Sequence, residues 1–553
     1  MRSKFLLTGL LLFGAVGLTA QDYDPFFPKP SYFKRHFGTV SPKVELQNPV
    51  HLDDFAVGGK LELSLKNYLQ LVMANNPDIS IQVVSVEIQK DAITRAFAIF
   101  DPLATARFTT TRQENPSSSA LNGATVLNTL NQPLSLSYSQ LLPAGTSYNV
   151  QFGNTRLSTN ASFATYNPSN SSNLNFNITQ PLLRGRGAWF TRLPITIARS
   201  KLKSSQYSLE DQVIQLISAA EVTYWSAVSA HETLRVQEEA LALADTALKR
   251  SNRELELGAI SSLEIYQPEA NYATAQIAVV QARYNVQNAE SALRRQMGAD
   301  ADPKYRDMPM VLTESVAPPT ETTAFDKEAL VERALRRRPD LRSQNETVGG
   351  DDLAIAQANN ALLPNLSLTA QYGALGQGGT FYDRQNIFLA DGTQNTIVSV
   401  TPGGFGNAFT QMFGFGYPTY GFGLTLQLPI RDRNAAANLA DAVVNKKLDA
   451  LHGRSIERTI RLQVLQAITQ VENSKASVEL AKVARDLAQK RVDADQKRYE
   501  LGTTTIFFVL ASQNDLVTAE SALVRESINY RINLMTLLQR TGELLDERGI
   551  QIQ

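Results

Sequence analysis

Two long stretches of the chain alternate apolar and charged positions with the period of an α-helix. Residues 189–257 and 433–501 carry small or moderate apolar side chains at three- and four-residue spacing, such as Val213, Leu216 and Ala220. A helix over 189–257 would be roughly 100 Å long, at about 1.5 Å per residue. Helices of this length with one apolar stripe are expected to pack as long antiparallel pairs.

Each long stretch ends at a glycine, and a second helical pattern follows it. Gly258 ends the first stretch and Gly502 the second, and the patterns beyond them continue to about residues 297 and 541. Glycine accepts the left-handed backbone that commonly ends a helix. The two glycines therefore predict the turns of two helical hairpins.

Shorter segments alternate apolar and polar residues with a period of two, which is typical of strands with two different faces. Such segments begin at Pro102 and Pro364, and returning strands are predicted over 173–183 and 420–430. The glycine- and aromatic-rich stretch 412–429 also has the strand pattern. In the first half, a helix over 64–100 precedes the strands. The pattern predicts two strands per half and four in the chain.

The two halves repeat the same order of predicted elements. Residues 253–298 align with 497–542 at a constant offset. Prolines elsewhere correspond with small changes of offset: Pro77 with Pro339, Pro102 with Pro364, and Pro181 with Pro429. This pattern predicts an internal duplication.

The duplication suggests a division of the chain into six segments. We predict a signal peptide over 1–20, an extended N-terminal periplasmic segment over 21–60, a first repeat over 61–298, an inter-repeat linker over 299–325, a second repeat over 326–545 and a short C-terminal tail over 546–553. The signal peptide is predicted because Arg2 and Lys4 precede an apolar run that ends in small residues at Ala20. After the predicted signal peptide, the sequence has no stretch of about 18 apolar residues, so we predict no transmembrane helix there.

Composition and motifs argue against an enzyme, a metalloprotein or a nucleic-acid-binding protein. Lys plus Arg and Asp plus Glu both number 53, so there is no basic excess that would favour nucleic acid. The chain has no cysteine, which excludes disulfides and thiolate metal sites. The segment HETLR at His231 begins like a zinc-protease helix, but Arg235 stands at the second ligand position. We expect no catalytic residue, metal or cofactor.

The predicted strands suggest that several copies share one membrane barrel. A chain without an apolar helix crosses a bilayer only as a closed barrel, because every backbone group needs a partner there. Four strands fall below the eight of small bacterial barrels. The alternative is a structural coiled-coil protein of the cell envelope without transport activity, which the long helices alone would also fit.

The order of helix, strands and long helix pair, present twice, resembles the TolC-like outer-membrane efflux protein family. The resemblance covers about residues 60–545, including the strand-to-helix segments QPLLRGRG and LPIRDRN and both ELG turns. It implies an α+β membrane protein in which long antiparallel helical hairpins form a periplasmic tunnel. Four strands per chain would contribute to a shared, trimeric, twelve-stranded β-barrel in outer-membrane lipid.

The resemblance also implies partners and cargo. The homotrimer would dock on an inner-membrane pump through a periplasmic adaptor protein. It would export small toxic molecules, or unfolded protein in type I secretion. One segment departs from the family pattern: residues 132–155 add alternating sequence around a predicted turn at Pro143. The sequence leaves open whether this segment is an extra hairpin, an extracellular extension or a longer strand.

The resemblance places the periplasmic aperture at the two glycine turns. Family members usually carry an acidic residue six positions after the glycine, which is Glu264 in the first repeat but Phe508 in the second. Thr504 replaces a basic residue of the family. Phe508 is expected to form an apolar ring in three copies or to belong to helix packing, and Glu264 to line the aperture or to be a solvated charge. The residues expected at the aperture are Gly258, Glu264, Tyr499, Gly502, Thr504 and Phe508.

Overall fold

The computed structural model describes residues 32, 35, 36, 50–118, 122–317, 325–385 and 396–551. The chain divides into two units, Met1–Asn48 and Pro49–Gln553, and the fold described below is that of the second unit. The predicted signal peptide lies outside the described residues, as do parts of the predicted segments 21–60, 299–325 and 546–553.

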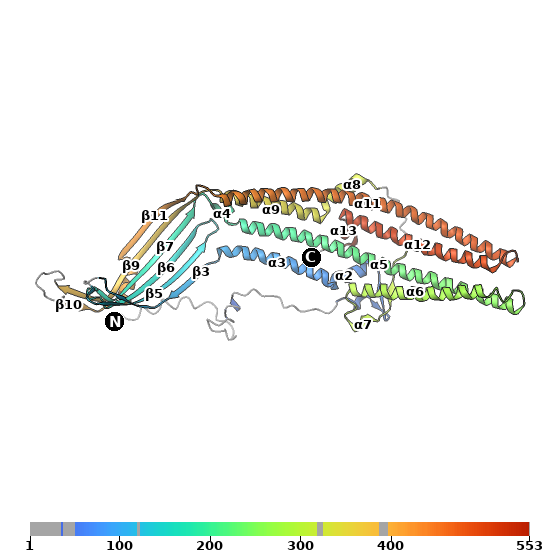
Figure 1. The fold of residues 1–553 in the computed structure, drawn as a ribbon, viewed down its shortest axis with the longest axis horizontal. Coiled ribbons are helices and arrows are strands. Elements are labelled where there is room, and N and C mark those ends of the chain that lie inside the picture. Colours follow the sequence, from blue (N-terminus) through green and yellow to red (C-terminus); the bar gives the residue numbers. More distant parts are fainter. Residues whose placement is uncertain are drawn as a thin grey trace. The chain divides into compact units, whose positions relative to one another are not determined.

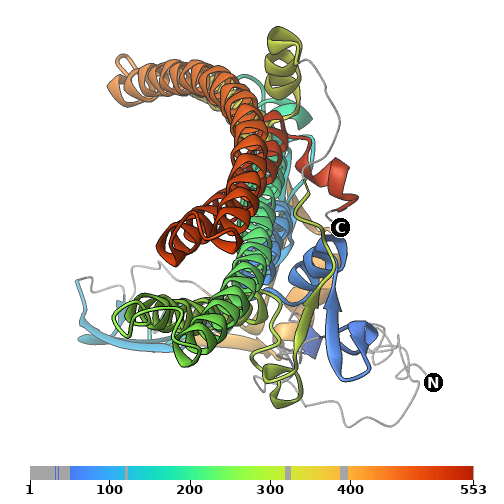
Figure 2. The ribbon, with the colours of Figure 1, turned by 90° about the vertical axis from the view of Figure 1, so that its right-hand side faces the viewer.

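The long helices form two antiparallel pairs, as their apolar periodicity predicts. The pairs are α5 (Leu193–Glu256) with α6 (Tyr266–Gln296), and α11 (Arg433–Glu500) with α12 (Ile506–Thr541). Helices α5 and α12 pack against each other, so the pairs lie side by side (Figure 2). Both pairs turn at the end that lies away from the sheet (Figure 1).

Each half opens with two helices that are separated at a proline. Helix α2 (Leu65–Asn75) precedes α3 (Pro77–Phe97), and α8 (Lys327–Arg337) precedes α9 (Pro339–Ala361). The prediction of one helix over 64–100 is therefore wrong. Proline disfavours a helical conformation in the residue before it. Accordingly, Asn76 has an extended backbone, and its side chain caps α3 by accepting a hydrogen bond from the Asp78 N–H. Shorter helical elements are η1 (Asp53–Phe55), η2 (Ala98–Phe100) and α4 (Gly187–Thr191).

Within the described residues, eight strands form one antiparallel sheet at the end opposite the hairpin turns (Figure 1). They are β3 (Leu103–Phe108), β4 (Thr111–Pro116), β5 (Val126–Leu141), β6 (Ser147–Thr159), β7 (Tyr166–Pro181), β9 (Asn365–Gln385), β10 (Thr396–Thr401) and β11 (Tyr417–Gln427). Both β3 and β4 pair with β5, and both β10 and β11 pair with β9. The eight strands therefore fill six positions across the sheet.

The prediction of four strands per chain is wrong because residues 132–155 form an extra hairpin. This segment belongs to β5 and β6, which pair from Thr129 with Thr159 to Leu141 with Ser147. The turn between them is closed by a hydrogen bond from the Leu142 N–H to the Thr146 carbonyl. Alternation revealed extended segments here, but it does not specify how many of them pair as separate strands.

The two faces of the sheet differ in polarity. Residues that pair across neighbouring strands point to the same side, so their rows define each face. One row contains Tyr138, Val150, Phe176, Tyr372 and Tyr420, and this side is called the apolar face. The next row, on the opposite side, contains Ser137, Gln151, Asn175, Gly373 and Thr419, and this side is called the polar face.

The stretch 412–429, predicted as strand, also contains the end of a helix. Helix α10 (Phe405–Phe413) precedes β11, which begins only at Tyr417. Phe405, Phe409 and Phe413 recur at helical spacing, and the helix packs on β9 and β7. The strand prediction was wrong for Met412 and Phe413 because this spacing and packing favour the helix.

A small second sheet connects the predicted linker with the start of the first repeat. It consists of β1 (Ala56–Val57), β2 (Lys60–Leu63) and β8 (Met310–Leu312), with β2 and β8 parallel. Thus the region predicted as a linker over 299–325 contains β8 and the short helix α7 (Pro303–Arg306). The Tyr224 hydroxyl of α5 donates to the Leu63 carbonyl at 3.0 Å, which attaches this sheet to the long helix.

A buried ion pair holds the C-terminal helix α13 (Leu544–Arg548) on α5. Glu221 is 1% exposed, and Arg548 donates to both of its carboxylate oxygens, at 3.0 and 2.6 Å. The Trp225 indole N–H donates to the same carboxylate at 3.3 Å. Two hydrogen bonds from one guanidinium make this the type of ion pair whose disruption is costly.

Replacing Arg548 by alanine should destabilise the fold by about 3–5 kcal/mol, because Glu221 would remain buried without its cation. The measurement is thermal unfolding of the purified protein, followed by circular dichroism. The control is Arg235→Ala on the same helix α5, where Arg235 is 57% exposed and pairs with the half-buried Glu232 and the exposed Glu239. That variant should lose at most about 1 kcal/mol. Equal losses in both variants would show that the buried pair has no special role.

Candidate functional site

The turns of the two helix pairs form the candidate site predicted from the sequence. Gly258 and Gly502 have φ values of +74° and +71°, and no heavy atom lies within 4 Å of the Cβ position of either. The Ala259 N–H donates to the Glu254 carbonyl, and the Thr503 N–H donates to the Arg498 carbonyl. The left-handed turns predicted at both glycines are therefore confirmed. Backbone conformation, rather than lack of space, requires glycine at these positions.

The two turns are not equivalent in detail. Glu264 is exposed in the turn before α6, whereas Phe508 lies in the first turn of α12 and is 52% exposed. Thr504 is half-buried in the turn before α12. The Phe508 ring meets the Phe507 ring edge to face at 5.5 Å between centroids. Equivalent positions in the sequence alignment thus differ in local structure.

Tyr499 connects the two helix pairs next to their turns. Its hydroxyl donates to Glu254 Oε2 on α5 at 2.5 Å, and the Arg250 guanidinium lies 4.7 Å above its ring. Arg250 also pairs with Glu254 at 2.9 Å. Burial raises the pKa of Tyr499 to about 12, with further contributions from the hydrogen bond to Glu254 and from its charge, while Arg250 acts in the opposite direction. The neutral phenol is therefore the form that supports this contact.

An apolar cluster continues the same contact. Ile506, Val509 and Leu510 of α12 pack with Ala247 of α5, and Tyr499 lies against them. The apolar run after Gly502 therefore packs between the helix pairs, while Phe507 and Phe508 remain exposed. Glu254 and Arg250 were missed in the sequence. The only signal in the sequence was that Glu254 precedes Gly258, and Tyr499 precedes Gly502, by a similar number of residues.

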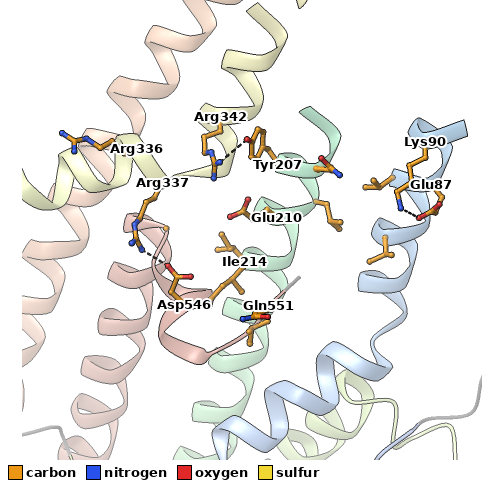
Figure 3. Close-up of a pocket in the computed structure, with 17 residues that line it drawn as sticks. Glu87, Lys90, Tyr207, Glu210, Ile214, Arg336, Arg337, Arg342, Asp546 and Gln551 are labelled. Carbon is orange, nitrogen blue, oxygen red and sulfur yellow. Dashed lines mark hydrogen bonds and ion pairs between the residues drawn. The ribbon is translucent and has the colours of Figure 1, made fainter. Parts of the chain in front are cut away.

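A cavity of about 970 Å³ between α3, α5, α8, α9 and α13 is a second candidate site (Figure 3). Arg337 pairs with Asp546 at 2.7 Å, and Arg342 stacks on Tyr207 at 4.3 Å and donates to its hydroxyl. Burial is the main cause of a raised pKa at Glu210. Because these contacts connect the surrounding helices, we interpret the cavity as a junction between helices rather than as a ligand site.

The described residues offer no other evident chemistry. In this part of the chain, no three His, Cys, Asp or Glu side chains are placed to hold a metal ion. Within the described ranges, none of the helices combines the length and apolar character of a transmembrane span.

Comparisons with known proteins agree on one family. Residues 68–299 and 330–543 match the family model of the outer membrane efflux protein. The chain is also 22% identical over 367 residues to the outer membrane efflux protein BepC of Brucella suis, covering 66% of this chain and 71% of BepC.

Solved structures share the fold at low sequence identity. The CmeC outer membrane channel of Campylobacter jejuni aligns with a TM-score of 0.57 and 17% identity, covering 91% of each chain. The outer membrane protein VceC of Vibrio cholerae aligns with a TM-score of 0.59 and 13% identity, covering 86% of this chain and 96% of VceC.

Tyr499→Phe should make the junction of the helix pairs less sensitive to alkali. Because the folded pKa lies above the ordinary value of 10.0, stabilisation by Tyr499 is complete below about pH 10 and is lost as the pH rises through about 12. The melting temperature of the wild type should therefore fall more steeply over this window than that of Tyr499→Phe. Tyr284→Phe, which alters an exposed tyrosine of α6, is the control and should follow the wild type. A Tyr499→Phe profile as steep as that of the wild type would contradict the prediction.

Proposed function

Because the chain belongs to the outer membrane efflux protein family, we propose that it is the outer-membrane channel of a tripartite efflux or type I secretion system. Three copies would form a barrel in the outer membrane and a helical tunnel through the periplasm, for the export of small molecules or proteins. The single observation that carries this proposal is a sheet with one apolar and one polar face at the end of two long helix pairs. An apolar outer face and a polar inner face are what a membrane channel requires.

The strand pairing supports a wider barrel than the family resemblance implied. Within the described residues, β3 and β4 pair only with β5, and β11 pairs only with β9, so both outer positions offer free edges. At one edge, β3 follows η2 and runs away from the helices, and at the other edge, β11 runs toward the helices and leads into α11. The two edge strands therefore run in opposite directions. Neighbouring copies would therefore join in antiparallel pairing. Three copies of six positions would close eighteen strands, instead of twelve.

The duplicated organisation remains part of the proposal. The repeats over 61–298 and 326–545 would each contribute one opening helix region, one set of strands and one long helix pair. Segments 1–20, 21–60, 299–325 and 546–553 would be a signal peptide, a periplasmic segment, the inter-repeat connection and a tail. The inter-repeat connection would be attached to the start of the first repeat, because its strand β8 pairs with β2.

The hairpin turns are proposed as the periplasmic end, where an adaptor protein and an inner-membrane pump would dock. Leu257 and Leu501, beside the two glycines, are each 78% exposed, and exposed leucines at a turn favour contact with a partner. The Tyr499–Glu254 hydrogen bond would hold the two helix pairs together there. In three copies, Phe508 would form an apolar constriction and Glu264 an acidic ring at the aperture near Gly258, Gly502 and Thr504.

A structural coiled-coil protein of the cell envelope is the less favoured function. Such a protein would use the long helices but has no need for a sheet with an exposed apolar face. On β11, Tyr420 and Phe422 of this face are 80% and 86% exposed in the single chain. Membrane lipid would cover these side chains.

Native mass spectrometry in mild detergent should detect three chains, because the edge strands of one copy lack partners. Cryo-electron microscopy of the same sample should show eighteen strands around the barrel. Electrophoresis of outer-membrane fractions should give a trimer-sized band that dissociates on heating. A stable, folded single chain in detergent would refute the shared barrel.

Substituting the proposed aperture residues one at a time should change ion conduction in planar bilayers. Glu264→Gln should reduce the preference for cations, because carboxylates near a narrow pore lower the energy of a passing cation. Phe508→Ser should raise the single-channel conductance by widening an apolar constriction. Glu62→Gln, which alters an exposed carboxylate of β2 in the small second sheet, is the control for Glu264.

The two measurements separate the roles of these residues. A reversal potential in a salt gradient that is the same for wild type and Glu264→Gln would exclude Glu264 from the aperture. Unchanged conductance of Phe508→Ser would assign Phe508 to helix packing. Neither result alone would remove the proposed channel.

A further inference from the structure

Helix α10 packs unusually closely on the apolar face of the sheet. A Cβ atom on Gly376 would lie 1.9 Å from the Ala408 carbonyl oxygen, and one on Gly378 would lie 2.3 Å from the Gly404 carbonyl oxygen. Both glycines point to the same side of β9 as Tyr372, on the apolar face. The Gln377 N–H also donates to the Gln411 side chain of α10 at 2.7 Å. Because Gly376 and Gly378 have no Cβ atom, the backbone of α10 can contact β9 directly, and the two residues are called the glycine contact.

The side chains of α10 divide into three groups around its axis. Ala408 and Met412 are fully buried against the sheet. Phe405, Phe409 and Phe413 form a continuous row, with ring centroids 5.4 and 4.6 Å apart, and the outer two are 45% and 51% exposed. Asn407 and Thr410 are exposed on the remaining side. The helix is therefore amphipathic even after it has packed on the sheet.

The phenylalanine row is directed toward the helical end of the sheet. Phe409 contacts the Phe152 ring of β6 at 6.2 Å, and Phe152 is in the same row as Leu174 and Ala374. Ala374 lies before Gly376 along β9, and therefore nearer to α9. Beyond α10, Phe415 meets the Tyr372 ring at 6.0 Å. The exposed rings of α10 therefore continue the apolar face.

The same side of the sheet becomes polar in the rows that α10 covers. The row that contains Gly376 includes Ser172 and Asn154, and the next row contains Asn170, Arg156 and Gln132. Arg156 donates to the Gln132 side chain at 3.1 Å. Helix α10 therefore lies at the border between the apolar and polar parts of this side.

We propose that α10 is a surface helix of the outer leaflet, whose phenylalanine row inserts among the acyl chains of outer-leaflet lipid. The proposal rests on the proposed function, in which the apolar face meets the outer membrane. A helix with apolar residues on one side and uncharged polar residues on the other suits the boundary between acyl chains and headgroups. Another copy in the barrel does not cover the row, because α10 lies over β9, β7 and β6, whereas copies join at β3, β4, β10 and β11.

Single spin labels provide the test, since the natural chain contains no cysteine that would react elsewhere. Four cysteine variants of the full chain would be labelled and reconstituted as trimers in phosphatidylcholine vesicles. Phe413→Cys reports on the row and Thr410→Cys on the polar side of the same helix. Phe422→Cys on the apolar face and Asn175→Cys on the polar face are the reference positions. Accessibility to oxygen, which concentrates in lipid, is compared with accessibility to a water-soluble nickel chelate.

We expect the label at position 413 to match that at 422, with an oxygen-to-nickel ratio severalfold above those at 410 and 175. A water-like ratio at 413 beside a lipid-like ratio at 422 would overturn the role of α10 while the proposed channel stands. A water-like ratio at 422 would refute the proposed membrane face itself. Protection of 413 from both reagents would show that protein, such as a second trimer, covers the row, and would also overturn the proposal.

A glycine substitution tests whether the glycine contact on β9 positions the phenylalanine row of α10. Gly376→Val should make the label at position 413 more mobile and reduce its oxygen-to-nickel ratio, because the new side chain would displace the Ala408 carbonyl. Gly406→Val is the matched control on α10, since no atom lies within 4 Å of its Cβ position. Equal spectra in the two backgrounds would show that the close packing does not place the row in lipid.

Discussion

The hydrogen-bond ladder between β7 and β9 is the connection on which the arrangement of the two halves depends. It pairs residues from Ser169 with Gly379 to Pro181 with Ser367, and it continues past the end of β7 with the Leu182 N–H donating to the Leu366 carbonyl of β9. Both strands connect to helices at the same end of the sheet, β7 to α4 and α5 and β9 to α9. Because one residue of slippage would exchange the faces of a strand, the pairing register also determines which side of the sheet is apolar.

The register of this ladder extends into the helical part of the molecule. The Gly185 N–H donates to the Asn360 side chain, just where the strands give way to helices. Farther along, Ser204 of α5 and Ser343 of α9 are hydrogen-bonded at 2.9 Å between their hydroxyl oxygens. Small side chains allow such close approach, which explains why these long helices are rich in serine and alanine rather than in large apolar residues. The sheet and the helix layer are thus aligned by one continuous set of contacts.

Local periodicity predicted the long helix pairs well, and it predicted the sheet poorly. The expected helix over 433–501 agrees with α11 (Arg433–Glu500), and both glycine turns lie where helical periodicity ends. The sheet required knowledge that no local pattern contains, since the hairpin β5–β6 depends on which segments pair. Helix α10 was missed because its nine residues lie among strand-like sequence, although Phe405, Phe409 and Phe413 have helical spacing. The Tyr499–Glu254 contact joins residues far apart in the sequence, so only the packing of α5 and α12 brings them together.

The polar face has a composition that bears on how molecules would travel along it. In β5, β6 and β7, most of its paired positions carry hydroxyl and amide side chains, including Ser135, Ser137, Gln151, Asn173 and Asn177, and none carries a charge. On the neighbouring β3, Arg107 pairs with Ser135 and brings one positive charge to this face. Hydroxyls and amides hold a layer of exchangeable water without attracting either sign of ion. In the proposed channel, such a wall would be a hydrated, non-adhesive lining. Cations, anions and neutral molecules could slide past these three strands with similar friction, which would leave discrimination between them to Arg107 and to the hairpin end.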